Sequence, residues 1–162
     1  MSDAGVAPNK RAGVEVEDAI IASVDGLEAV PNPDAHHDAV CRDAVHPSAD
    51  LPMVLLCVLE RGTHVEIKSA LDAYTGGREQ RGRFYFRPQQ HAALLDAGGS
   101  YLFAVCERGL ATDARTVIAR KVVPATIVDD VLPEWFDGGE GRGDYAQVSW
   151  SRLFRPEEVA RQ

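Results

Sequence analysis

A glutamate and a lysine, Glu66 and Lys68, stand two positions apart in the segment His64–Ser69. Val65 and Ile67 occupy the alternate positions. Because side chains alternate between the two faces of a β-strand, this spacing predicts two buried aliphatic groups on one face and a carboxylate and an ammonium on the other. Charge on an interior strand is costly unless the groups are paired or bind something, so the pair is a candidate site. The alternative is an exposed edge strand with a surface ion pair, which contributes little to stability.

The stretch from residue 68 to residue 91 is the only positively charged part of the sequence. It carries five basic and two acidic residues, whereas the whole chain has a net charge of −8. Arginine offers paired donors to phosphate oxygens, so this stretch can attract a phosphate backbone even in an acidic protein. A solvated loop that carries arginines is the alternative. The candidate nucleic-acid-binding residues are Arg78, Arg81, Arg83 and Arg87.

Length and composition limit the class of protein. A chain of 162 residues with 45% hydrophobic and 26% charged residues is typical of one soluble globular domain and excludes a collagen-like or wholly disordered chain. The longest unbroken apolar run, Met53–Leu59, is too short to cross a bilayer. Three well-separated cysteines argue against a disulfide framework, and we expect a cytoplasmic location. Many Asp, Ala and Arg residues and few Lys indicate a halophilic source.

The order of apolar patterns predicts a mixed α/β fold, with helices over a central β-sheet. Residues 1–11 are expected to form a flexible tail and residues 12–162 a single domain. We predict a helix over 14–25, a long loop over 30–49 with at most a short strand or helical turn, and a hairpin of strands Met53–Leu59 and His64–Ser69. A strand over 82–87, a helix over 88–97, strands over 101–106, 115–123 and 145–150, and a last helix from Pro156 should follow.

Glu66-x-Lys68 on an apolar hairpin, followed by an arginine-rich strand and a helix that begins with QQH, resembles the signature of the PD-(D/E)xK nuclease superfamily. The stretch VEIKSA…RGRFYF…QH also resembles small uncharacterised members of this superfamily from halophilic archaea. The resemblance covers roughly residues 50–107 and implies a restriction-endonuclease-like core. It implies a metal-dependent nuclease that hydrolyses phosphodiester bonds in DNA. The alternatives are a catalytically inactive nucleic-acid-binding or assembly module with the same fold, and an interaction protein whose arginines meet an acidic partner.

Three residues of the hairpin take roles from this resemblance. Glu66 would be a metal ligand, the backbone carbonyl of Ile67 a further ligand, and Lys68 the cation that orients the attacking water. The implied cofactor is Mg²⁺, with Mn²⁺ as an alternative, because hard cations prefer oxygen ligands.

The family's first acidic residue usually lies just before the first hairpin strand, and this position is taken by Asp50. A hairpin that turns near Gly62 places Glu66 opposite residues 57 and 58 rather than opposite Asp50, so the hairpin has to bulge for Asp50 to reach the metal. Asp43 and Glu60 therefore stay open as alternatives.

Two further positions and the partners also follow from the resemblance. Members of the family often carry a glutamate on the first helix, for which Glu15 and Glu17 are the candidates. Gln90, at the start of the next helix, would lie near the scissile phosphate and belong to the catalytic group. The implied partner is duplex or branched DNA, a homodimer is an option, and no membrane partner is expected.

Overall fold

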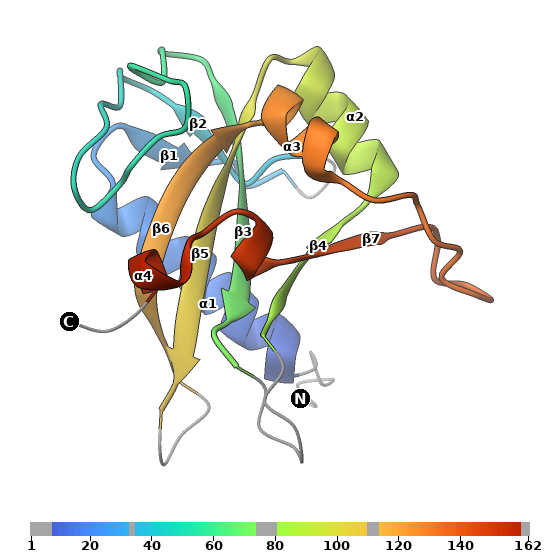
Figure 1. Ribbon diagram of the computed structural model, residues 1–162. Helices are drawn as coiled ribbons and strands as arrows, with labels where there is room; N and C mark the ends of the chain where they lie inside the picture. The colour runs from blue at the N-terminus through green and yellow to red at the C-terminus, as the bar shows by residue number, and fades with distance from the viewer. Residues whose placement is uncertain (1–7, 33–34, 74–80, 110–113, 160–162) are drawn as a thin grey trace, which may run out of the picture.

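The computed structural model describes residues 8–32, 35–73, 81–109 and 114–159, and its centre is a mixed sheet (Figure 1). The sheet has five strands in the order β1-β2-β3-β5-β6. β3 and β5 run parallel, while the other neighbouring strands are antiparallel. These strands are β1 (Leu27–Ala29), β2 (Ala39–Cys41), β3 (His64–Leu71), β5 (Ser100–Arg108) and β6 (Arg115–Pro124). The sheet and its flanking helices confirm the predicted α/β fold with helices over a central mixed sheet.

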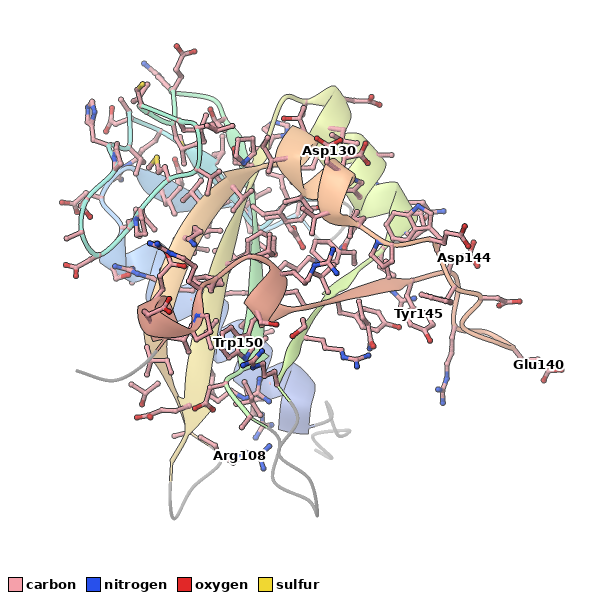
Figure 2. All side chains as sticks on the ribbon, viewed as in Figure 1. Arg108, Asp130, Glu140, Asp144, Tyr145 and Trp150 are labelled. Carbon is pink, nitrogen blue, oxygen red and sulfur yellow. The ribbon has the colours of Figure 1, made fainter. Side chains whose placement is uncertain are left out.

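A crossover joins the two parallel strands, as parallel pairing requires. It contains β4 (Arg83–Phe86) and α2 (Pro88–Asp96). β4 does not join the main sheet but pairs antiparallel with β7 (Ala146–Ser149). The resulting two-stranded ribbon extends to the right in Figure 1, and the chain that leads into β7 projects farther out, where Figure 2 labels Glu140 and Asp144.

One face of the sheet is covered by α1 (Pro8–Ser23), which lies behind the sheet in Figure 1. Its buried residues Val16 and Ile20 pack in one apolar cluster with Val65 and Ile67 of β3. They stand four positions apart, so they lie on the same side of the helix. α1 begins and ends earlier than the helix that the sequence predicts over residues 14–25. No helix in the described part of the chain is long and apolar enough to cross a membrane.

The opposite face is covered by the β4–β7 ribbon, α2, α3 (Ala125–Val131), the 3₁₀ turn Trp150–Arg152 and α4 (Pro156–Val159). A second apolar cluster lies here and is rich in aromatic side chains. Its large buried aromatic members are Phe84, Phe86, Tyr101, Phe103, Trp150 and Phe154. The alternation along β4 explains the burial, because the phenylalanines point inward while Arg83 and Tyr85 point outward.

The predicted strand Met53–Leu59 is wrong, and with it the predicted hairpin. Leu55 is 82% exposed and has a φ of 53°, a left-handed conformation that interrupts an extended strand. Met53 makes an isolated parallel bridge to Val122 at the edge of β6, and Leu59 makes one to Val45. The apolar run therefore covers a sheet edge and supplies side chains to the core without forming a ladder of its own.

The antiparallel neighbour of β3 is β2, a three-residue strand inside the segment predicted as a long loop. Its register pairs Ala39 with Val65 and Val40 with His64. Residues 42–63 form the long connection between these two strands. The hairpin that the resemblance led us to expect thus exists, but its first strand lies earlier in the sequence.

Gly82 fixes the start of β4 against the end of β3. Its amide donates to the Leu71 carbonyl at 3.0 Å, its own carbonyl accepts from the Trp150 amide at 3.1 Å, and an added Cβ would overlap the Leu71 carbonyl oxygen. We expect Gly82→Ala to lower the free energy of unfolding by about 2 kcal/mol or more, because backbone atoms cannot move aside cheaply. Gly13→Ala is the matched control: Gly13 lies within α1 with nothing within 4 Å of an added Cβ, so this change should stabilise by roughly 0.5–1 kcal/mol. Urea unfolding of both variants would contradict the packing described here if Gly82→Ala unfolded like the wild type.

Candidate active site

Glu66 and Lys68 lie on an interior strand and form an ion pair. Lys68 Nζ is 3.2 Å from Glu66 Oε1, and the two side chains are 14% and 7% exposed. β3 has β2 on one side and β5 on the other, so it is not an edge strand. The alternative of a solvated surface pair is therefore wrong. Lys68 Nζ also lies 5.7 Å from the centre of the Phe86 ring, which places β4 next to this pair.

A second carboxylate, Asp38, faces Glu66 from the adjoining strand. The β2–β3 register, continued by one residue, puts Asp38 opposite Glu66. Oδ2 of Asp38 accepts a hydrogen bond from the Ile67 amide at 2.8 Å, and the negative charge of Asp38 contributes to raising the pKa of Glu66. Ile67 itself points its side chain into the apolar cluster under α1. Sequence reasoning missed Asp38.

Glu17 of α1 is electrostatically part of the same group. Its pKa is raised to about 7, first by burial and then by the negative charge of Asp38, while Lys68 opposes the rise. Glu15, the other helix candidate, is exposed and lines a groove between α1 and β6. Of the two glutamates proposed from the sequence, Glu17 is therefore the one that interacts with the acidic site.

The site carries more acidic groups than its one lysine can offset once they are ionised. Burial raises the pKa of Glu66 to about 8; Lys68 opposes this rise, and Asp38 adds to it. Three carboxylates thus share one ammonium in a partly desolvated place. Within the described residues no group of three or more His, Cys, Asp or Glu side chains is arranged closely enough to hold a metal ion as it stands. The donor chemistry nevertheless fits a hard divalent cation, because every candidate ligand is an oxygen and the excess charge is negative.

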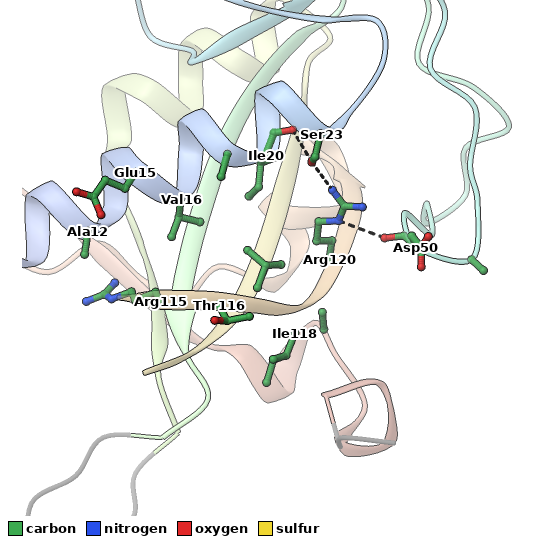
Figure 3. A pocket seen from close by; sticks show the side chains of 14 residues that line it. Ala12, Glu15, Val16, Ile20, Ser23, Asp50, Arg115, Thr116, Ile118 and Arg120 are labelled. Atoms are coloured by element: carbon green, nitrogen blue, oxygen red, sulfur yellow. Dashed lines mark hydrogen bonds between the residues drawn. The ribbon is translucent and has the colours of Figure 1, made fainter. Parts of the chain in front are cut away.

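Asp50 lies elsewhere. Its backbone carbonyl accepts from Arg120 Nε at 3.3 Å, and Arg120 Nη1 donates to Ser23 Oγ at 2.9 Å, which ties Asp50 to the C-terminal end of α1 and to β6 (Figure 3). The interactions of Glu66 among the described residues run to Lys68, Asp38 and Tyr101, and Asp50 has no part in them. The structure therefore does not bring the expected first acid to Glu66. The reason is that residues 53–59 do not form the predicted strand, which would have placed Asp50 beside Glu66.

The two alternatives, Asp43 and Glu60, are exposed and lie at the far end of the β2–β3 hairpin. Glu60 begins the turn that leads into β3, where its carbonyl accepts from the Thr63 amide at 3.1 Å. Asp43 stands two residues after Cys41, the last residue of β2. Both are several residues beyond the position opposite Glu66.

Three of the predicted arginines, Arg81, Arg83 and Arg87, lie along the extended segment that contains β4. Arg83 is exposed on its outer face, and the guanidinium of Arg81 lies 5.2 Å from the Trp150 ring. Arg87 Nη1 donates to the Arg142 carbonyl at 2.7 Å, so part of its donor capacity holds the chain before β7. Arg78 is outside the described residues.

Gln90, the remaining predicted catalytic residue, is half-buried in the first turn of α2. It lines a groove together with Arg87, Arg142 and His36, and His36 lies two residues before Asp38. The next residue, His91, is buried against β5, where it meets Tyr101. The groove connects the loop that carries Asp38 with the arginine-bearing end of β4.

One comparison with known proteins is positive. A family model described as a PD-(D/E)XK nuclease superfamily domain matches residues 3–155. Neither the curated proteins nor the solved structures include a significant match to the chain.

The raised pKa of Glu66 predicts a specific pH dependence of stability. Between pH 4.5 and about 8 the folded state binds more protons at Glu66 than the unfolded state, so the free energy of unfolding falls as pH rises through this window. Glu66→Gln removes this dependence while keeping the shape of the neutral acid. In EDTA at pH 8 the variant should be more stable than the wild type by roughly 4 kcal/mol, and at pH 4 nearly equal to it. Urea unfolding across this range checks the sign. Glu60→Gln, at an exposed position, should follow the wild type, and a Glu66→Gln curve parallel to the wild type would contradict the described environment.

Proposed function

The chain belongs to the PD-(D/E)XK nuclease superfamily, and we propose that it is a metal-dependent nuclease that hydrolyses phosphodiester bonds in DNA. The observation that carries this proposal is the interior Glu66–Lys68 pair, held 3.2 Å apart and faced by Asp38. A buried acidic group with one lysine is costly for a structural element and suits a site that binds a cation and a phosphate.

Asp38 and Glu66 are the proposed metal ligands, and the Ile67 carbonyl stays a candidate third. A divalent cation bound there, Mg²⁺ or Mn²⁺, would neutralise charge on the scissile phosphate and lower the pKa of a bound water. Asp38 is held in place by the Ile67 amide, so its orientation does not depend on the ion. Glu17 adds negative charge from the helix side and would strengthen cation binding.

Lys68 is the proposed water-orienting residue. Its ammonium is held between Glu66 and the Phe86 ring, and this limits its movement. A fixed ammonium can donate one hydrogen bond to Glu66 and another to the attacking water, and it also offsets the charge that develops on the phosphate.

Contacts to DNA are proposed for the arginines of the β4 segment and for Gln90. Arg81 and Arg83 are exposed, and Arg87 and Gln90 line the groove that begins at the loop carrying Asp38. Arg78 belongs to the same proposal by sequence. These side chains would position the DNA backbone, because arginine contacts to phosphate are independent of base sequence.

A cleavage assay with matched acid variants tests the function and the choice of the first acid together. Supercoiled plasmid and a labelled duplex are incubated with Mg²⁺ or Mn²⁺ and the wild type, Asp38→Asn, Asp50→Asn or Lys68→Ala. Asp38→Asn and Lys68→Ala should lose about 100-fold or more in rate, because each removes a group that acts on the reacting phosphate. Asp50→Asn should cleave like the wild type.

The possible outcomes separate the hypotheses. Loss of cleavage in Asp50→Asn but not in Asp38→Asn would return the first acid to Asp50. DNA binding without cleavage, dependent on Arg83 and independent of Mg²⁺, would instead favour the inactive nucleic-acid-binding module. Equal cleavage by all four proteins would contradict the proposed site.

Cation binding can be measured without any substrate. A cation that binds only the folded protein raises its melting temperature with concentration. Mn²⁺ should therefore raise the melting temperature of the metal-free wild type, and Asp38→Asn should abolish most of this rise, whereas Asp50→Asn should keep it. An equal rise in Asp38→Asn would exclude Asp38 as a ligand.

A further inference from the structure

A buried hydrogen-bonded chain runs beside the acidic site from β5 through α2 to α3. Nδ1 of His91 lies 2.7 Å from Tyr101 Oη, and Nε2 lies 2.9 Å from Asp129 Oδ1. His91 and Tyr101 are 3% and 1% exposed, whereas the Asp129 side chain is 56% exposed. α2 and α3, which carry His91 and Asp129, lie side by side in Figure 1. None of the roles proposed above uses these three residues.

The direction of the two hydrogen bonds follows from their acceptors. An ionised carboxylate can only accept, so Nε2 of His91 carries the proton that is shared with Asp129. In the neutral imidazole Nδ1 is then a lone pair, and it accepts the hydroxyl proton of Tyr101. With His91 neutral, Asp129 therefore sets the tautomer of His91, and Nδ1 of His91 accepts the only proton that Tyr101 can donate.

Tyr101 is the neighbour of Glu66 across the β3–β5 ladder. The register pairs the two residues directly, and adjacent strands lie roughly 4.8 Å apart. Both side chains leave the sheet on the face opposite α1, because Tyr101 belongs to the second apolar cluster and Glu66 alternates with Val65 and Ile67 of the first. The charge of Glu66 also contributes, after burial, to raising the pKa of the Tyr101 phenol above its ordinary value. Tyr101 thus keeps its proton next to a carboxylate.

We propose that Asp129 and His91 withhold the Tyr101 proton from Glu66, so that the Glu66 oxygens remain available to Lys68 and to a cation. A phenol that donated to Glu66 would stabilise that carboxylate and occupy one of its oxygens, in competition with a metal ion. His91 and Asp129 are positioning residues in this scheme, and Tyr101 is the group they restrain. The inference rests on the proposed function in one respect, since it takes the ligand of Glu66 to be a divalent cation.

The test is a double-mutant cycle on cation affinity. Mn²⁺ is titrated into metal-free wild type, His91→Leu, Tyr101→Phe and the double variant, with calorimetry as the readout. His91→Leu frees the phenol and should weaken Mn²⁺ binding about 10-fold. Tyr101→Phe should bind like the wild type, and the double variant should recover to within about threefold of it, because the competing proton is gone. Far-ultraviolet circular dichroism confirms that each variant is folded.

Recovery in the double variant separates this role from a merely structural one. If His91 only fills space, removing a second polar group cannot restore affinity, and a double variant as weak as His91→Leu would overturn the proposal. Unchanged affinity in His91→Leu would overturn it as well.

If the wild type binds no Mn²⁺, this result counts against the proposed function. A second measurement, made without metal, then tests the present proposal on its own. The infrared carboxylate band of Glu66 is assigned by its loss in Glu66→Gln and recorded above pH 9 without metal. It should shift in His91→Leu, as expected for a new hydrogen bond, and return in the double variant. No shift would contradict the proposal independently of nuclease activity.

Discussion

The geometry of the acidic site depends on the backbone hydrogen bonds that fix Asp38. Its amide donates to the Val65 carbonyl at 3.0 Å, its carbonyl accepts from the Val30 amide at 2.9 Å, and its side chain accepts from the Ile67 amide at 2.8 Å. β2 is only three residues long, so the ladder alone would hold its register weakly. Because a slip by one residue turns every side chain of a strand to the other face, these bonds keep a carboxylate opposite Glu66.

The rest of the fold offsets the cost of this arrangement. Glu66, Asp38 and Lys68 lie between the two apolar clusters, and burial works against the charge of Glu66. Glu66 and Asp38 are held close together in the folded state, which raises the pKa of Glu66, because backbone hydrogen bonds fix Asp38 and β3 lies between β2 and β5. Such unfavourable electrostatics, maintained by surrounding packing, are characteristic of functional sites.

The sequence predicts those parts of the molecule whose pattern is local. The alternation along His64–Ser69 defines β3, and Pro88 together with Gly98 brackets α2 almost to the residue. The pattern also identifies Glu66 and Lys68 as a pair on one face. Family resemblance adds the expectation of a neighbouring acid but does not locate it.

The sequence predicts Asp50, rather than Asp38, as the first acid because two local patterns are misleading. Met53–Leu59 has the composition of a buried strand, yet the left-handed backbone of Leu55 and the bridge to β6 are set by tertiary contacts that no local pattern shows. Asp38, by contrast, precedes only three apolar residues, within a segment of prolines and histidines that is typical of a loop. Its importance emerges once the Ala39–Val65 pairing is known.

The β4–β7 pairing also affects the order of assembly, because chains fold as they are synthesised from the N-terminus. The described strands of the main sheet are all synthesised once the chain reaches Pro124. The described partner of β4 is synthesised later, because it ends at Ser149. Phe84 and Phe86 must therefore wait for a segment that is synthesised after the described strands of the main sheet, and the wall beside Lys68 closes later than that sheet.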